Sequence, residues 1–196
     1  MSKNAKMTNP MKVITGPNTR WSYANVWEPK SINGGTPKYS VSLIIPKSDT
    51  KTVAKIEAAI VAAYCEGEAK LKGNGKSVPA LSVLKTPLRD GDLERPDDPA
   101  YAGSYFVNAN ATSAPGIVDA DRNPILTRSE VYSGVYGRAS ISFYAFNSSG
   151  NAALTICRRF VMASLLVVRL LLNLTLQLMT TMIFLTNGGD KLWKQS

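Results

Sequence analysis

The chain of 196 residues contains no histidine and only two cysteines. The absence of histidine excludes imidazole-based acid–base chemistry and the Cys/His nucleophilic pairs of many enzymes. The cysteines, Cys65 and Cys157, are too few for a disulfide framework or a cysteine-based metal site. We therefore expect a protein that is not an enzyme, needs no cofactor or metal, and works in a reducing cytoplasm.

Motifs that bind phosphates or hard cations are also missing. Gly34-Gly35 lacks the Lys-Ser/Thr pair of a P-loop and the helix context of a dinucleotide-binding turn. Asp90-Gly91-Asp92 and Asp119-Ala120-Asp121 lack the further oxygen ligands that a calcium loop places at set spacing, so we interpret both as turns. The N-terminal MSKNAKMTNP has no apolar segment of the kind found in signal peptides, so secretion is not expected.

Charge is unevenly distributed along the chain, whose formal net charge is +9. Residues 1–150 hold 18 Lys/Arg and 13 Asp/Glu, a balance of +5, and the rest of the chain contributes the remaining +4. The main part of the chain is therefore only mildly basic. A chain of this length fits one domain with a core of ordinary size.

The sequence changes character from about Asn151, where a leucine-rich run, FVMASLLVVRLLLNLTLQLMTTMIFL, replaces the earlier mixed composition. Because Met has a single codon, a frame that begins one base earlier must encode Asp across Met179-Thr180 and Met182-Ile183, and Gly across Met162-Ala163. With permitted codons this frame gives a polar loop, a Gly-Gly turn and an acidic tail that ends at a stop codon. We therefore predict that residues 152–196 are a frameshifted tail, helical or disordered, and that the protein loses its closing strand, exposes a sheet edge and tends to aggregate or to associate with membranes.

A tail anchor is the alternative interpretation of this segment. Residues 160–186 are long enough to span a bilayer, for which about 20 apolar residues suffice. Arg169, Asn173 and Gln177 lie inside the run, however, and a central Arg costs roughly 2.5 to 3.5 kcal/mol on insertion scales. The membrane interpretation stays open at this point.

Residues 11–151, after a flexible N-terminus at 1–10, predict one β-rich domain. Alternation of apolar and polar residues, bounded by turn residues, indicates strands at 12–15, 20–27, 38–45, 104–111 and 131–146. A helix is predicted at 50–71, with Asp49 as its N-cap. Short strands with one helix favour a mainly β fold, a small closed or partly closed barrel.

The last predicted strand carries the clearest functional pattern. Its odd positions from Val135 to Ala145 are small or apolar and suit a core, whereas its even positions place Tyr136, Arg138 and Tyr144 on the opposite face. Aromatic rings stack on unpaired bases for about 1 to 3 kcal/mol each, and Arg neutralises phosphates, so this mixture is typical of a single-strand binding groove. The alternative is that Tyr144 and the nearby Phe146 cover a second core under the helix.

A second aromatic set lies in the strand at 20–27. Trp21, Tyr23 and Trp27 are predicted to share a face, and Arg20 and Lys38 lie near enough in the predicted sheet to supply phosphate contacts. Three large aromatics on one strand face are more often core than binding platform. We therefore expect some of them to be buried and the others to contact bases.

The strand at 104–111 places Phe106 on one face with Asn108 and Asn110, and Phe106 is a further candidate for base stacking. The complete predicted DNA interface joins cations for the phosphates with aromatics for the bases. Its residues are Arg20, Trp21, Tyr23, Lys38, Arg89, Phe106, Tyr136, Arg138 and Tyr144.

Within residues 10–151 stand the stretches WSYANVWEP, KYSVSLIIPKSD, PLRDGD and YSGVYGRASISFYAFNSSGN. They resemble the single-stranded-DNA-binding protein family of tailed phages and prophages. The resemblance implies an oligonucleotide-binding (OB) barrel that coats single-stranded DNA during phage replication or recombination in the host cytoplasm. An intact acidic tail would occupy the basic groove when DNA is absent and recruit phage replication or recombination proteins. A homo-oligomer is compatible with the sequence, and a small structural virion protein is the remaining alternative.

Overall fold

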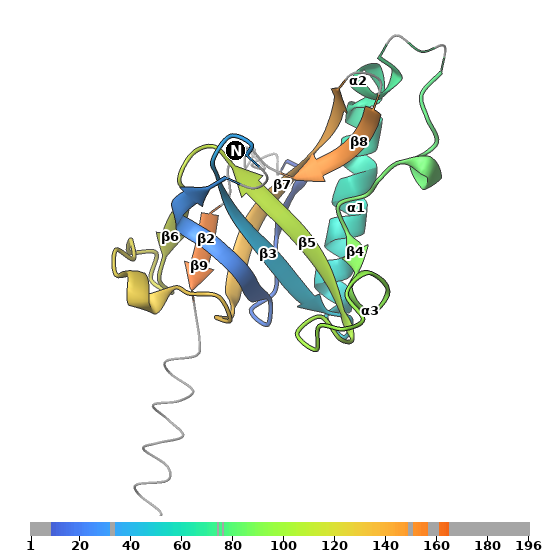
Figure 1. Cartoon of the computed structure of the whole chain (residues 1–196). Helices are drawn as coiled ribbons and strands as arrows, with labels where there is room; N and C mark the ends of the chain where they lie inside the picture. The colour runs from blue at the N-terminus through green and yellow to red at the C-terminus, as the bar shows by residue number, and fades with distance from the viewer. Residues whose placement is uncertain are drawn as a thin grey trace, which may run out of the picture.

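The computed structural model describes residues 9–31, 34–73, 75, 77–148, 151–156 and 161–164, and these form two β-sheets and three α-helices (Figure 1). The strands are Lys12–Ile14 (β1), Arg20–Lys30 (β2), Lys38–Pro46 (β3), Arg89–Asp90 (β4), Ser104–Ala111 (β5), Gly116–Val118 (β6), Gly137–Ser148 (β7), Asn151–Ile156 (β8) and Val161–Ser164 (β9). The helices are Thr50–Glu66 (α1), Glu68–Lys72 (α2) and Gly91–Glu94 (α3), with 3₁₀ turns at Leu81–Val83 and Arg128–Glu130.

The two sheets are joined at one edge. The first has the order β1-β7-β9-β6, with β8 also paired to β7, and the second has the order β2-β3-β5-β4. They meet where Arg20 bridges Tyr136 and the amide of Trp21 donates to the carbonyl of Val135 at 2.8 Å. The predicted mainly β fold is confirmed, but the described strands form two linked sheets in place of one continuous closed ladder.

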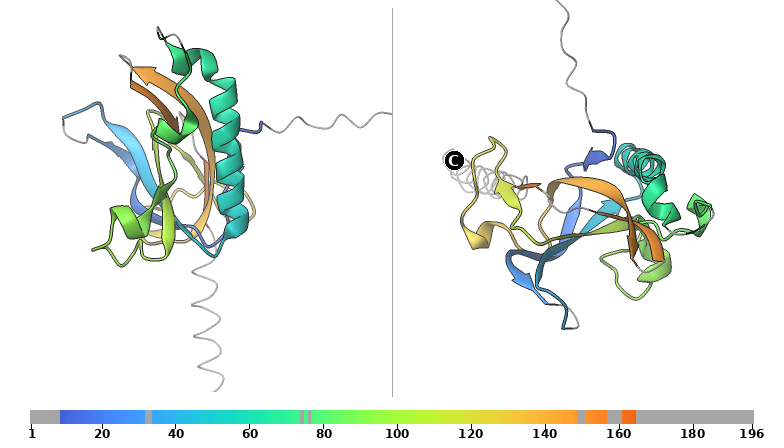
Figure 2. Two further views of the ribbon diagram at one scale, coloured as in Figure 1. Left: turned by 90° about the vertical axis from the view of Figure 1, so that its right-hand side faces the viewer. Right: turned by 90° about the horizontal axis from the view of Figure 1, so that it is seen from above.

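The core lies between the sheets and under α1, which runs alongside the long curved β7 (Figure 2). Alternate residues of β3, β5 and β7 point into it because successive side chains of a strand face opposite sides. α1 adds a stripe of small and branched residues from its buried face. Fully buried examples are Leu43, Ile45, Ile56, Ala59, Val107, Ala139 and Ile141.

Helix α1 begins where the sequence predicts and ends earlier. Asp49 caps it by accepting from the amide of Thr52 at 3.2 Å and from its hydroxyl at 2.6 Å. The predicted helix to residue 71 is divided at Gly67, whose amide donates to the carbonyls of Ala63 and Tyr64 and ends α1. A Cβ at Gly67 would lie 2.0 Å from the Cβ of Ala145 on β7. Only glycine permits this close approach between helix and strand, and α2 then continues in a new direction.

The sheets extend past residue 151, which was the predicted end of the domain. β8 pairs with residues 143–148 of β7, and β9 pairs with residues 137–140 of β7 and, in parallel, with β6. Leu154 is buried in the main core, so apolar side chains of NAALTI pack on the sheet. For these two segments the expected helical or disordered conformation is corrected, because both are strands.

The predicted membrane segment overlaps the described residues only at β9. The remainder of residues 160–186 lies outside the described residues. Among the residues that the structure describes, no helix is long and apolar enough to cross a membrane.

Candidate nucleic-acid interface

The outward face of β7, together with Tyr136 directly before the strand, carries the aromatic and cationic side chains that the alternation predicts. Val135, Ile141 and Phe143 are buried, with exposed fractions of 4%, 0% and 1%, whereas Tyr136 is 41% exposed and Arg138 is exposed. The predicted division of this strand into a core face and an outer face is therefore confirmed. An exposed ring and an exposed guanidinium two residues apart can contact a base and a phosphate of one strand.

Arg20 and Lys38 extend this face across the second sheet. The bridge between Arg20 and Tyr136 places the two side chains on the same side, next to each other. Lys38 is exposed at the start of β3, opposite Lys30. Among the described residues no carboxylate pairs with either Arg20 or Lys38. Their charges are thus available to an anion.

Small polar residues fill the outer surface of the second sheet between these cations. They are paired in register across β2, β3 and β5, and Asn108 and Asn110 are exposed. Their hydroxyl and amide groups donate and accept hydrogen bonds without adding charge. The residues concerned are Ser22, Asn25, Ser40, Asn108 and Asn110, whereas Ser42 on the same face is buried and accepts from the hydroxyl of Tyr101 at 3.1 Å.

Tyr23 projects from a β-bulge. The pairing of β2 with β3 shifts between Ser22 and Asn25, and Tyr23 has a φ of 47°, a left-handed conformation that is uncommon for a bulky residue. Its side chain is 59% exposed. The bulge also breaks the predicted common face of this strand, because Trp21 and Val26 point into the core on either side of it.

Trp21 cannot stack on a base in this structure. It is fully buried in the main core, and its Nε1 donates to the carbonyl oxygen of Gly137 at 3.2 Å. The half-buried Trp27 donates in the same way to the carbonyl of Val131 at 2.9 Å. The stacking role predicted for Trp21 is therefore replaced by a structural one, in which it joins β2 to β7.

Phe106 is fully buried as well, although it faces outward from β5. Its ring makes an edge-to-face contact with the buried Tyr101, with centroids 5.0 Å apart and planes at 81°. The guanidinium groups of Arg89 and Arg95 lie 4.8 Å and 5.9 Å from the Phe106 ring centroid. The segment that contains α3 thus covers this ring, and the predicted stacking role of Phe106 is corrected.

Arg89 is engaged by a carboxylate. Its Nε donates to Glu94 Oε2 at 2.7 Å, and its Nη2 donates to the same oxygen. This contact raises the pKa of Arg89 above its ordinary value and lowers the pKa of Glu94. A phosphate at Arg89 would have to replace Glu94, so the predicted phosphate contact is not free in this structure.

A second ion pair holds the same segment against β3. Lys47 Nζ lies 2.8 Å from Asp90 Oδ2 and 2.7 Å from Asp92 Oδ2, and it also lies 5.1 Å from the centroid of the Tyr105 ring. Hydrogen bonds to the two carboxylates raise the pKa of Lys47, and Lys47, followed by the amide of Gly103, lowers the pKa of Asp92. Where the sequence predicted a turn, the structure has the short helix α3, with Asp90 as its N-cap and Asp92 in its first turn.

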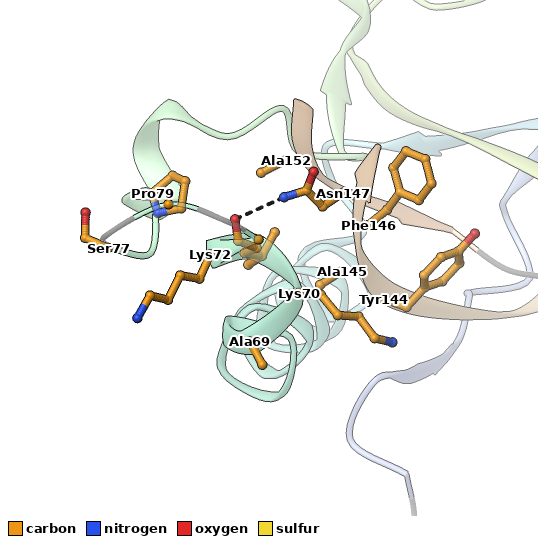
Figure 3. A pocket seen from close by; sticks show the side chains of 13 residues that line it. Ala69, Lys70, Lys72, Ser77, Pro79, Tyr144, Ala145, Phe146, Asn147 and Ala152 are labelled. Atoms are coloured by element: carbon orange, nitrogen blue, oxygen red, sulfur yellow. Dashed lines mark hydrogen bonds between the residues drawn. The ribbon is translucent and has the colours of Figure 1, made fainter. Parts of the chain in front are cut away.

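Tyr144 lies in a pocket that the sequence did not indicate. The pocket has a volume of about 1020 Å³ and lies between α2, the segment that follows it, and the end of β7 (Figure 3). Phe146, which is 45% exposed, lies beside Tyr144, and Lys70 and Lys72 come from α2. About 70 residues separate the lysines from the aromatics in sequence, so only the fold brings them together. Within the described residues no group of His, Cys, Asp and Glu could hold a metal ion.

The family model of the Enterobacter phage Enc34 ssDNA-binding protein matches residues 11–165. The chain belongs to this family. The match includes every strand from β1 to β9. A curated relative, protein p50 of Acyrthosiphon pisum secondary endosymbiont phage 1, is 31% identical over 141 residues, which are 68% of this chain and 73% of the relative.

Solved structures of the Enc34 family share the fold. The C-terminally truncated single-stranded DNA-binding protein of bacteriophage Enc34 superposes with a TM-score of 0.62 at 21% identity, covering 79% of this chain and 86% of that one. The same phage protein in complex with ssDNA gives a TM-score of 0.59 at 23% identity, covering 79% and 85%. The gp2.5 single-stranded DNA-binding protein of bacteriophage T7 gives 0.52 at 16% identity, covering 79% and 87%.

Proposed function

We propose that this phage protein binds single-stranded DNA along the outward face of β7 and the adjoining outer face of β2 and β3. The observation that carries the proposal is the exposure of Tyr136 and Arg138 at the start of β7, where the alternate residues from Val135 to Ala145 are buried. Arg20, Lys38 and Arg138 neutralise phosphates, while Tyr136 and Tyr144 stack on bases. Tyr23, projecting from its bulge, supplies a further ring at the side of the same surface.

Binding of this kind tolerates many sequences, because every base has a face that a ring can stack on. The surface between the cations holds neutral Ser and Asn side chains. Membership in a family of ssDNA-binding proteins supports a coating role in phage replication or recombination, carried out as binding and not as catalysis. The host cytoplasm is the compartment in which such a protein works.

Quenching of intrinsic tyrosine and tryptophan fluorescence by oligo(dT), measured at several salt concentrations, tests this proposal. A duplex of equal length is the control. Three phosphate contacts predict that log K falls with log[salt] with a slope of about −2, since each contact contributes about 0.7 on single strands. An affinity that salt does not change, or equal binding of the duplex, would contradict the proposal.

Residues 165–196 lie outside the described residues, so predictions about the tail stay predictions. They include the one-base shift, the acidic tail of an intact version, its recruitment of replication or recombination proteins, and the tail-anchored alternative. Resequencing the gene tests the shift, and deleting the restored tail tests whether it competes with DNA. No observation on the described residues favours a virion or membrane role over DNA binding.

A further inference from the structure

The pocket between α2 and the end of β7 is lined by both aromatic and positively charged side chains. Tyr144 and Phe146 project on one side, with Lys70 reaching below Tyr144 in the view of Figure 3, and Lys72 projects on the other side. The side-chain amide of Asn147 donates to the carbonyl of Leu71 at 3.4 Å and joins the two walls. The pocket is therefore built from packed elements and not from loops alone.

We propose that this pocket is a second contact region for single-stranded DNA, which receives further nucleotides of the strand that is bound at Tyr136 and Arg138. Lys70 and Lys72 contact phosphates there, and Tyr144 and Phe146 stack on bases. The inference rests on the proposed function. It adds the place of a second contact region, the role of each side chain there and a dependence of affinity on oligonucleotide length.

The electrostatics of α2 favour a polyanion. Lys70 and Lys72 lie in its last turn and are exposed, whereas its acidic residue, Glu68, lies in the first turn. Among the described residues neither lysine forms a salt bridge. Both lysines are therefore available to an anion from solution.

The position of the pocket makes the bound ligand a continuation of the same strand. Tyr136, Arg138, Tyr144 and Phe146 lie on one face of one chain segment, because side chains at even positions of β7 point outward throughout. The face between them adds the exposed Lys12 of β1, which is paired opposite Ser142. At about 3.3 Å per residue, the ten steps from Tyr136 to Phe146 extend over about 33 Å along the chain. A short oligonucleotide therefore occupies one end of this surface, and a longer one reaches both.

The exposed rings argue for a nucleic acid over an acidic peptide as the occupant. A peptide would satisfy the lysines by charge alone, but Phe146 leaves 45% of its surface in water with no charge to satisfy. Stacking on bases uses both kinds of side chain at once, and the same pairing of ring and cation recurs at Tyr136 and Arg138.

The test uses the full chain and compares oligo(dT) of about four nucleotides with oligo(dT) of about 16, the range of site sizes for such folds. The double variant Lys70→Ala/Lys72→Ala should bind the long strand about 25-fold more weakly at about 0.1 M salt, with the salt slope reduced by about 1.4. Phe146→Ala should weaken the long strand by about five-fold or more. Both variants should bind the short strand as the parent does.

The matched control is Lys51→Ala/Lys55→Ala, which removes two exposed lysines from the first half of α1 and gives the same net charge. It should leave both strands unaffected, and thermal unfolding verifies that all variants are folded. Unchanged binding of the long strand by the Lys70/Lys72 variant, a loss that the control shares, or equal losses for both lengths would each overturn the inference. A parent protein that binds neither strand would overturn the proposed function itself.

Discussion

Replacement of Tyr136 by alanine separates base stacking from charge in this interface. Tyr136 lies between two cations, bridged to Arg20 and two residues before Arg138, and its ring is 41% exposed. Removing one stacked ring costs about 1 to 3 kcal/mol, which weakens binding by about 5- to 150-fold. Because no charge is lost, the slope of log K against log[salt] should stay that of the parent protein.

Arg138→Ala should give the opposite signature. It removes one phosphate contact, so the salt slope should become less steep by about 0.7, and the affinity at about 0.1 M salt should fall by about five-fold. Arg138 lies in β7 and Tyr136 lies two residues before it, so a general disturbance at the start of this strand would affect both in the same way.

The assay is the anisotropy of fluorescently labelled oligo(dT), titrated with protein at four or more salt concentrations. Tyr136→Phe keeps the ring and Arg138→Lys keeps the charge, so both should bind nearly as the parent does. The reasoning is refuted if Tyr136→Ala binds as tightly as the parent. It is also refuted if Tyr136→Ala shows the less steep salt slope that is expected for Arg138→Ala. Thermal unfolding of each variant verifies that β7 remains folded.

Three further predictions concern the framework that holds this surface. Trp21→Ala should lower the free energy of unfolding by about 3 to 5 kcal/mol in urea titrations, since the fully buried ring fills the core; a loss below about 1 kcal/mol would contradict its structural role. Gly67→Ala should cost about 1 to 3 kcal/mol by the same measurement, because the new methyl group would meet Ala145 at 2.0 Å. Lys47 lowers the pKa of Asp92, so the stabilisation from this pair is present above the ordinary pKa of 3.8 and is lost as pH falls through the lower folded-state value. Lys47→Met should therefore reduce the acid sensitivity of thermal melts between about pH 2 and pH 6, and an unchanged sensitivity would contradict the pairing.

Period-two alternation allowed the sequence to predict most of β7, although the strand begins at Gly137 and not at residue 131. Between Gly137 and Phe146 one pattern holds, and every inward position is small or apolar. The N-cap of α1 was predictable for a similar reason, since Asp49 acts on an amide only three residues away. Local chemistry determined both features.

The other site residues depend on contacts that alternation does not encode. The bulge at Tyr23 turns Trp21 inward and Tyr23 outward, against the single face expected for β2. Phe106 does face outward as predicted, but residues 89–103 fold back over it and bring Arg89 and Arg95 onto its ring. No ion pairs in this loop were predicted from the sequence, and its many Asp and Arg residues do not by themselves give the partners.

β7 is the strand that α1, α2, β1, β8 and β9 all contact. Selection for a packed core therefore acts on the odd positions of this segment, and selection for DNA binding acts on the even positions. A complete substitution library of residues 135–147 would separate the two effects. Odd positions should tolerate few changes in any host, whereas even positions should tolerate many changes where DNA binding is not required. A relative that has lost the function should thus keep half of this strand and randomise the other half.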